Sequence, residues 1–520
     1  MTGTKSEMGI SEFYAGQTLL ITGCTGFMGK VLLEKLLRSC PEIERIYVLI
    51  RSKRGQSATE RLESLLKSKL FDKVRNETIN IQNKIVPVCG DIVEEKLGLS
   101  DEDIQMLSQQ VSVVFHSAAT VKFDEELRLS LQMNVIGVKS LIELCHKFKK
   151  LKALIHVSTA YANCDKNVIE EKVYDPPLNP NRLIDAAEWM DNDAMNSLTV
   201  KLLGNRPNTY TYTKAMAEYL ILQECGDLPV AIVRPSIVGS SWKEPFPGWV
   251  DNYNGPTGLL VAIGKGVLRC MMGNFNGTAD ILPVDIATNL MITVGWHTAV
   301  NKPEKLMVYN NTTGQLNKFT WGQMERFSYE YFMKNPIDEI ARVPNPRFTK
   351  YLLWKDLNVI FDHLLPAYVM DFYLWVVGRK PIFVKIQDKL WKAVKSLEFF
   401  TSHEWKFAND NIIMLAEHMT VKDREIFDFD VRKIRWGQYM ENYCLGTKQF
   451  VLKENPQHLP KARRALQKLQ RMHFLMNAVV FMVVWRLLIN RVKVAKSLWN
   501  LLIGWALFIF QKIPKLARST

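Results

Sequence analysis

Short apolar runs alternate with helical segments in the first half of the chain, and this alternation constrains the fold more strongly than any other feature. Continuous apolar runs of this length are typical of strands buried on both faces of a sheet. The runs occupy residues 17–23, 46–50, 85–89, 111–115, 153–157 and 230–233, with helical segments such as 29–39, 125–149 and 212–225 between them. Strands that alternate with helices pair in parallel. The sequence therefore predicts an α/β fold with a doubly wound parallel sheet.

The pattern changes near residue 344. Three prolines interrupt it within residues 335–348, and the segments at 351–378, 384–400 and 408–415 have helical spacing and many aromatic side chains. No further alternation of strand and helix follows. We therefore predict an α/β domain over residues 1–340, a helical C-terminal domain over residues 345–455, and a separate terminal segment over residues 456–520.

The positive charge is concentrated in that terminal segment. The chain has 67 Lys and Arg against 53 Asp and Glu, a net charge of +14. Residues 456–520 hold six Lys, six Arg and no acidic residue, so they carry +12 of this charge. The rest of the chain is nearly neutral and has no stripe of basic and aromatic residues suited to nucleic acid. We expect no nucleic-acid partner.

The terminal segment is also apolar. Residues 474–485 and 498–510 are two hydrophobic runs that contain Trp and are flanked by basic residues, a composition typical of a bilayer interface. Each run spans about 18–20 Å as a helix, against a hydrocarbon core of about 30 Å. One tilted span, a shallow hairpin and a pair of interfacial helices remain open, as does a buried helical hairpin. We predict that residues 474–510 attach the chain to a lipid bilayer.

The eight cysteines and the N-terminal residues bear on the compartment. No two cysteines have CxxC spacing, which fits a reducing compartment and predicts no metal site. The first sixteen residues contain no apolar run, so no secretory signal is expected. The main body is expected to face the cytosol.

A glycine-rich loop joins the first predicted strand to the first helix. Gly23, Gly26 and Gly29 are spaced three apart, which suits a tight turn, a close approach of backbone to a pyrophosphate, and close packing of helix on strand. This arrangement is typical of a Rossmann-type dinucleotide site; a glycine turn with packing roles only is the alternative. The other residues of the loop expected to contact the cofactor are Thr22, Thr25, Phe27 and Met28.

Charged residues follow the second and third strands. Arg51 and Arg54 occupy positions where NAD-binding proteins usually have an acidic residue, and a cation there favours the 2′-phosphate of NADP. A solvated basic loop is the alternative. Asp91 can accept a hydrogen bond from the adenine amino group, or it can cap its own turn.

The fourth strand ends in small residues. Ala118 and Ala119 leave room for the cofactor backbone, and we expect both to contact it. His116, at the end of the same strand, is interpreted as a core residue rather than a base.

A tyrosine and a lysine provide the candidate chemistry. Lys214 lies four positions after Tyr210, which places them on one face of a helix. An ammonium near the phenol favours tyrosinate and lowers its pKa. Thr159, or its neighbour Ser158, can supply a hydroxyl to the same substrate oxygen.

Taken together, these motifs resemble the extended short-chain dehydrogenases/reductases and, more narrowly, the fatty acyl-CoA reductases of animals. The similarity is carried by residues 22–41, 114–124, 156–164, 206–219, 233–256 and 429–450. It implies that residues 1–340 form an NADPH-binding reductase domain that includes part of the substrate site. It also implies reduction of a long-chain fatty acyl-CoA to a primary alcohol, by two hydride transfers through an aldehyde with release of CoA.

The resemblance assigns roles to individual residues. Tyr210 protonates the developing alkoxide, Lys214 holds the nicotinamide ribose, and Thr159 polarises the carbonyl. Asn134 positions Lys214 through a water molecule. The residues placed beside the nicotinamide are Pro235, Ser236, Ile237 and Val238.

By the same resemblance the membrane is peroxisomal, with the catalytic domain facing the cytosol, and the alcohols supply ether-lipid and wax synthesis. An endoplasmic reticulum membrane is the alternative. Two other functions remain open, a membrane-bound 3β-hydroxysteroid dehydrogenase and a non-catalytic NADPH-binding protein. The loop at residues 242–256 either lines the acyl chain or is purely structural. The sequence does not predict the oligomeric state.

Overall fold

A seven-stranded parallel sheet forms the centre of the computed structural model, which describes residues 8–53, 55–77, 83–491, 496–505 and 508. The strand order is β11-β7-β5-β4-β1-β2-β3. The strands are β1 (Thr18–Thr22), β2 (Arg45–Ile50), β3 (Ile85–Cys89), β4 (Val113–His116), β5 (Ala153–Val157), β7 (Val230–Pro235) and β11 (Met307–Asn311). Six of them confirm predicted strands, and β11 was not predicted. The chain reverses its direction of travel across the sheet between β1 and β4, which opens a crevice at their carboxyl ends.

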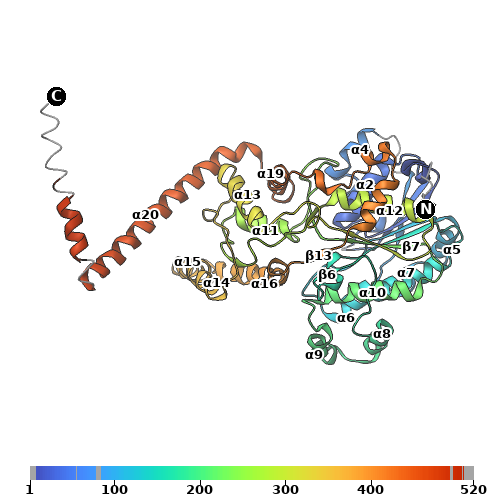
Figure 1. The fold of residues 1–520 in the computed structure, drawn as a ribbon, viewed down its shortest axis with the longest axis horizontal. Coiled ribbons are helices and arrows are strands. Elements are labelled where there is room, and N and C mark those ends of the chain that lie inside the picture. Colours follow the sequence, from blue (N-terminus) through green and yellow to red (C-terminus); the bar gives the residue numbers. More distant parts are fainter. Residues whose placement is uncertain (1–7, 54, 78–82, 492–495, 506–507, 509–520) are drawn as a thin grey trace.

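Helices cover both faces of the sheet (Figure 1), which confirms the doubly wound fold. On one face lie α2 (Phe27–Ser39) and α12 (Val284–Asn301), and on the other lie α5 (Asp101–Gln110), α7 (Gly137–His146) and α10 (Thr209–Glu224). Side chains alternate along β1, with Leu19 and Ile21 in one core and Leu20 in the other. A strand buried on both sides needs apolar residues at every position, and this explains the continuous apolar runs.

The C-terminal region is helical, as predicted. Its helices are α14 (Leu352–Asn358), the π-helical turn η6 (Val359–Leu364), α15 (Leu365–Val376), α16 (Phe383–Ser402), α17 (Asp410–His418), α18 (Val421–Ile426) and α19 (Trp436–Gly446). Leu415, Tyr439 and Tyr443 belong to the same hydrophobic core as α2 and α12. Short parallel pairings also tie this region to the α/β part: β13 (Lys406–Phe407) pairs with β6 (Val168–Ile169), and β12 (Phe348–Thr349) with β9 (Met271–Met272).

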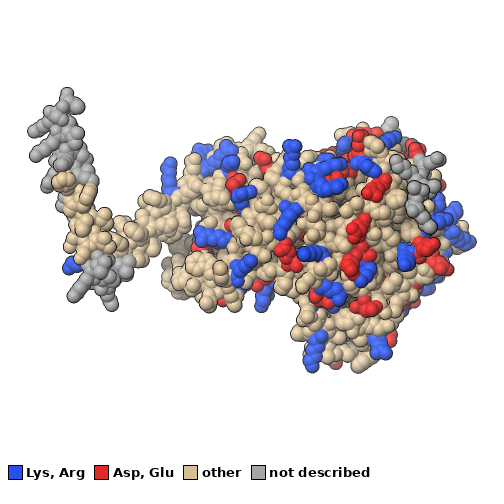
Figure 2. Space-filling view, viewed as in Figure 1, with Lys and Arg blue, Asp and Glu red and all other residues tan. Residues whose placement is uncertain are grey.

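The last described long helix, α20 (Leu459–Arg491), leaves the body as an extended arm (Figure 1). Five of the seven basic residues of α20 lie within residues 461–471. Figure 2 shows the outer part of the arm largely free of charged side chains, whereas the body carries both signs. It contains the first of the two runs predicted to bind a bilayer, and there Phe474 and Phe481 are 73% and 65% exposed. Residues 492–495, 506–507 and 509–510 of the predicted bilayer segment lie outside the described residues.

A second exposed apolar helical stretch, besides α20, was not predicted from the sequence. Among the described residues, one helical stretch, Leu352–Val376, is long and apolar enough to cross a membrane, and only 11% of its most apolar window is buried. The stretch comprises α14, η6 and α15.

Candidate active site

The glycine loop lies at the end of β1, where the crevice opens. Gly23 has a φ of +75°, and a Cβ at this position would lie 2.7 Å from the backbone nitrogen of Ala118. A Cβ on Gly29 would lie 2.2 Å from the Gly23 carbonyl oxygen. Real Cβ atoms do not approach backbone this closely, so the turn and the packing of α2 on the loop both require glycine.

The N-terminus of α2 faces the crevice directly after the loop. Gly26 precedes the helix, and the first N–H groups of a helix have no partner within it. These groups and the helix dipole attract an anion, so Phe27 and Met28 stand where a pyrophosphate would bind. The Phe27 ring stacks on Trp249, with centroids 5.4 Å apart. The loop fits a dinucleotide in both shape and polarity.

The Thr22 side chain is fully buried beneath the loop. Its Oγ1 lies 2.7 Å from Nδ1 of His116 and accepts a hydrogen bond from the Ala118 backbone N–H at 3.3 Å. Thr22 thereby fixes the end of β4 against β1 and sets the position of Ala118. Ala118 and Ala119 remain partly exposed at the crevice.

Two charged residues meet at the far edge of the crevice. Arg51 follows β2 and Asp91 follows β3, and Nη1 of Arg51 donates to Oδ2 of Asp91 at 3.2 Å. The Arg51 side chain is 46% exposed, so it is free to turn toward a ligand. Asp91 also accepts from the Val93 backbone within its own turn at 3.4 Å. Arg54 lies outside the described residues.

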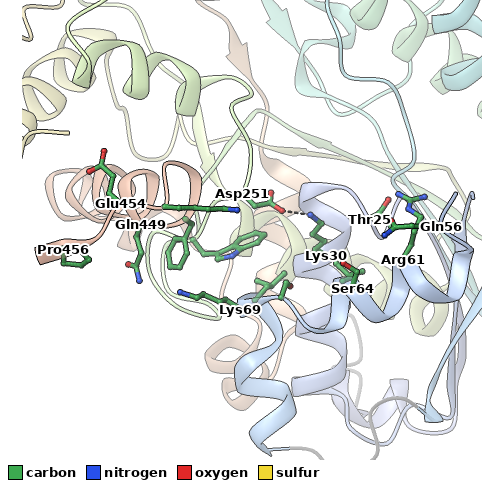
Figure 3. A pocket seen from close by; sticks show the side chains of 16 residues that line it. Thr25, Lys30, Gln56, Arg61, Ser64, Lys69, Asp251, Gln449, Glu454 and Pro456 are labelled. Atoms are coloured by element: carbon green, nitrogen blue, oxygen red, sulfur yellow. Dashed lines mark hydrogen bonds and ion pairs between the residues drawn. The ribbon is translucent and has the colours of Figure 1, made fainter. Parts of the chain in front are cut away.

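A cavity of about 790 Å³ opens beside the glycine loop and extends to the C-terminal region (Figure 3). Its basic side chains are Lys30, Arg61, Lys69 and Lys453. Its two carboxylates are both paired, Asp251 with Lys30 and Glu454 with Lys448. The excess of cations makes this cavity suited to a phosphorylated ligand.

The three predicted catalytic residues converge at the other end of the crevice. Asn208 caps α10 by accepting from the Thr211 N–H at 2.9 Å, and this fixes the first turn, which carries Tyr210. The Tyr210 phenol is hydrogen-bonded to the Thr159 hydroxyl, just beyond the end of β5. One turn along α10, Nζ of Lys214 donates to the carbonyl oxygen of Val157 at 2.7 Å.

Burial dominates the ionisation of this group. It raises the pKa of Tyr210 to about 12, against a smaller lowering by Thr159. It lowers the pKa of Lys214 to about 8, against a smaller raising by Glu218. The expectation that the Tyr210 pKa is lowered is therefore wrong, because desolvation has the largest effect on the phenol and only the Thr159 hydrogen bond opposes it. At neutral pH the phenol is protonated and ready to donate.

Thr159 rather than Ser158 faces the phenol. The Ser158 hydroxyl is buried and, within the part of the chain that the structure describes, has no hydrogen-bond partner. The Thr159 hydroxyl also donates to the Pro235 carbonyl at 3.5 Å. Pro235 thus lies against the Thr159 hydroxyl, and the half-buried Ile237 and Val238 follow it in β8 (Ile237–Gly239).

Asn134 lies behind the catalytic helix. It belongs to a π-helical turn, η4 (Gln132–Ile136), a feature often found at functional sites. Its Oδ1 accepts from the Thr120 N–H and its Nδ2 donates to the Thr213 hydroxyl, both at 3.0 Å. It therefore holds the residue next to Lys214. Its predicted link to Lys214 through water remains a prediction.

An aromatic wall next to Tyr210 was missed from sequence. The Phe123 ring lies 5.9 Å from that of Tyr210 and 5.2 Å from that of Phe400, which in turn lies 5.1 Å from Tyr161. Phe400 comes from α16, so the helical C-terminal region contributes to the site. The only sign of this wall in the sequence was the aromatic pair at 399–400. That pair gave no indication that Phe400 would contact Phe123.

Two buried histidines beneath the site do not act as bases. The rings of His116 and His156 lie 5.3 Å apart, and burial lowers the pKa of His116 to about 3 and that of His156 well below its usual range. The interpretation of His116 as a core residue is confirmed. No group of three or more His, Cys, Asp or Glu among the described residues is arranged to hold a metal ion.

The glycine loop lies at the switch point of a parallel sheet, and a tyrosine, a lysine and a hydroxyl lie at the opposite end of the crevice. This combination defines a nicotinamide-dependent reductase of the extended short-chain dehydrogenase/reductase type. Solved structures share this fold. The reductase domain of a nonribosomal peptide synthetase from Mycobacterium tuberculosis matches with a TM-score of 0.55 and 20% identity, covering 83% of this chain and 92% of that one. The terminal R domain of the myxalamid pathway matches with a TM-score of 0.54 and 20% identity, covering 83% and 90%.

The chain belongs to the fatty acyl-CoA reductase family, as its resemblance implied. Residues 21–291 match the NAD-binding family model described as male sterility protein, and residues 362–454 match the Sterile model of the same description. Fatty acyl-CoA reductase 1 of Xenopus laevis is 47% identical over 96% of both chains. The human protein of that name is 46% identical over 95% of this chain and 96% of its own length, and fatty acyl-CoA reductase 2 of Mus musculus is 43% identical over the same shares.

Proposed function

We propose that this protein reduces long-chain fatty acyl-CoA to the primary fatty alcohol, with NADPH as the reductant. The observation that carries the proposal is the hydrogen-bonded pair of Tyr210 and Thr159 beside the buried Lys214, in a chain that aligns with fatty acyl-CoA reductases over nearly its whole length. The bound cofactor supplies the hydride.

The residues that would hold the cofactor are spread along the crevice. The glycine loop and the start of α2 receive the pyrophosphate, because free N–H groups and the helix dipole meet there. Arg51 supports the choice of NADPH over NADH, since its half-exposed guanidinium can leave Asp91 for a 2′-phosphate. Lys214 and the backbone near Pro235 border the nicotinamide end.

Tyr210 and Thr159 act on the carbonyl oxygen of the substrate. Their hydroxyls donate hydrogen bonds to that oxygen, and these bonds strengthen as negative charge develops on it. In the first reduction the thioester loses CoA as a thiolate and an aldehyde remains. In the second, Tyr210 transfers its proton to the alkoxide of the alcohol. The high pKa of the phenol keeps this proton in place until the alkoxide forms.

The tail supports a membrane location. The exposed apolar side chains of α20 and the excess of cations in residues 456–520 suit attachment through residues 474–510 to a bilayer. Long acyl chains and fatty alcohols partition into bilayers, at about 0.8 kcal/mol per buried CH₂. By analogy with the family we place the enzyme on the peroxisomal membrane, facing the cytosol and supplying ether-lipid and wax synthesis. The endoplasmic reticulum is the alternative.

Product analysis tests the reaction. Purified full-length protein is given palmitoyl-CoA with NADPH or NADH, and alcohol, aldehyde and free CoA are measured. We expect fatty alcohol, with two NADPH oxidised for each alcohol. Tyr210→Phe should abolish alcohol formation, whereas Tyr219→Phe, the same change on the same helix, should leave it intact. Oxidation of a 3β-hydroxysteroid with NAD and no release of CoA would reject the proposal, as would full activity of Tyr210→Phe.

A further inference from the structure

The stretch from α14 to α15 presents an unusually apolar surface to solvent. Leu353 is 81% exposed and Trp375 is 67% exposed, and α14 buries none of its side chains. The other exposed large apolar residues of this stretch are Leu352, Trp354, Leu357, Ile360, Phe361, Leu365, Tyr368, Val369, Met370, Phe372, Tyr373 and Val376. Such a patch exceeds what soluble proteins leave uncovered and marks an interaction surface.

The stretch has a fixed shape. The chain turns at Gly378, which has a φ of +73°, and returns as α16 packed against α15. The carboxylate of Asp371 accepts from the backbone N–H groups of Ile382, Phe383 and Val384 at 2.8–2.9 Å, so it caps the returning helix from the outgoing one. We call residues 352–395 the apolar hairpin.

Cations border this apolar surface. Arg379 and Lys380 form the turn of the hairpin, and further exposed cations recur along α16. These are Lys385, Lys389, Lys392 and Lys395, none of which has an ion pair among the described residues. Asp388 is the one exposed acid among them. An apolar face bordered by unpaired lysines complements an anionic bilayer surface, with apolar groups for the acyl region and cations for the headgroups.

The hairpin cannot cross the bilayer. If Leu352–Val376 spanned it, Arg379 and Lys380 would lie on the far side and α16 would have to cross back. The lysines of α16 recur every three or four residues, which is costly inside hydrocarbon. Near the C-terminal end of α16, beyond the hairpin, Phe400 contacts Phe123 in the candidate active site. Both ends of the hairpin therefore stay on the side of the catalytic body.

We propose that the apolar hairpin lies flat in one leaflet of an anionic bilayer, as a second membrane attachment besides residues 474–510. Figure 1 places α15 and α20 at the same end of the long axis, opposite the sheet, so both can meet one membrane. This inference does not depend on the reaction proposed above. It seats α16 between the bilayer and the aromatic wall beside Tyr210.

Site-specific photocrosslinking tests the hairpin. Benzoylphenylalanine replaces Phe372 in the full-length protein, which is bound to phosphatidylcholine–phosphatidylserine vesicles and irradiated. Trp189, an aromatic residue 75% exposed on α8 (Pro180–Trp189), is the matched control, and Phe481 in α20 reports on the tail. Adducts are identified by mass spectrometry. We expect lipid adducts at 372 and none at 189.

Other outcomes reject the proposal. Lipid adducts at 481 without any at 372 would leave the tail as the membrane attachment and exclude the hairpin. Adducts from 372 to residues 459–520, or to a second copy of the chain, would show that protein rather than lipid covers it. Orientation is read separately by adding a membrane-impermeant amine reagent outside the vesicles. Lys380 should be modified as readily as Lys406, and its protection would mean a spanning hairpin.

Discussion

At the scale of single residues, the site places a proton donor, Tyr210, one helical turn from a titratable cation, Lys214. Burial raises the pKa of Tyr210 to about 12 and lowers that of Lys214 to about 8. The lysine therefore loses its proton at a lower pH than the tyrosine, the reverse of their usual order. The phenol therefore stays protonated throughout the physiological range. Lys214 is the group whose charge changes near working pH.

The pH dependence of aldehyde reduction follows from this. A lysine is charged below its pKa, so the ammonium of Lys214 is present below about pH 8 and is lost above it. We expect kcat for a long-chain aldehyde to hold below pH 8 and to fall by about tenfold per pH unit above it. In Lys214→Arg, which stays charged, the remaining activity should lack this fall. A wild-type profile that stays flat beyond pH 9 would show that the charge of Lys214 is not needed.

The proposed preference for NADPH rests on a single residue, Arg51. Removing the guanidinium in Arg51→Ala should raise KM for NADPH by roughly 10–100-fold, the equivalent of one charge-assisted hydrogen bond. KM for NADH should change little, because NADH lacks the 2′-phosphate. Lys53→Ala is the matched control, since Lys53 is an exposed cation two residues away. Equal losses for both cofactors would contradict the assignment.

At the scale of elements, the unit formed by β1, the glycine loop and α2 depends on close backbone packing at its glycines. The spacing of these glycines in the sequence already indicated this packing. In Gly29→Ala, the new methyl group would collide with the Gly23 carbonyl and push α2 off the loop. We expect a loss of about 1–3 kcal/mol in the free energy of unfolding, measured by denaturant titration, together with weaker NADPH binding. Gly437→Ala on α19 is the control, because its Cβ would meet nothing closer than 3.8 Å. A Gly29→Ala protein as stable as the wild type would contradict the close packing.

The sequence predicted these elements because their signals are local. A strand buried on both faces must be apolar throughout, and a Tyr–Lys pair four residues apart shares a helix face in any context. β11 was missed because Met307–Asn311 ends in polar residues. The buried Asn310 side chain is satisfied by residues distant in sequence: it donates to the carbonyls of Ile169 and Ala408 and accepts from Arg234. The pKa of Tyr210 was mispredicted for a related reason, since it depends on burial by elements distant in sequence.

At the scale of the whole molecule, the C-terminal region completes the active site. α16 runs from the apolar hairpin to the Phe400 ring, which packs on Phe123 and Tyr161 beside the Tyr210 phenol. No sequence pattern links residue 400 to residue 123, because their contact depends on how the helical region docks on the sheet. The division at residues 340–345 therefore describes composition, and both sides of it contribute to one hydrophobic core.

Phe400→Leu tests this long-range contribution. Leucine keeps most of the volume but loses the ring contacts of Phe400, among them the two with Phe123 and Tyr161 beside the site, each worth about 0.5–1.5 kcal/mol. We expect kcat/KM for a long-chain acyl-CoA to fall by roughly 5–100-fold, with an unchanged pH profile because Tyr210 and Lys214 are intact. Phe399→Leu is the matched control, since Phe399 packs on His403 and Trp405 instead of Phe123. If both substitutions lowered kcat/KM equally, the effect would reflect loosening of α16 as a whole; if neither did, the aromatic wall would not border the path of the substrate.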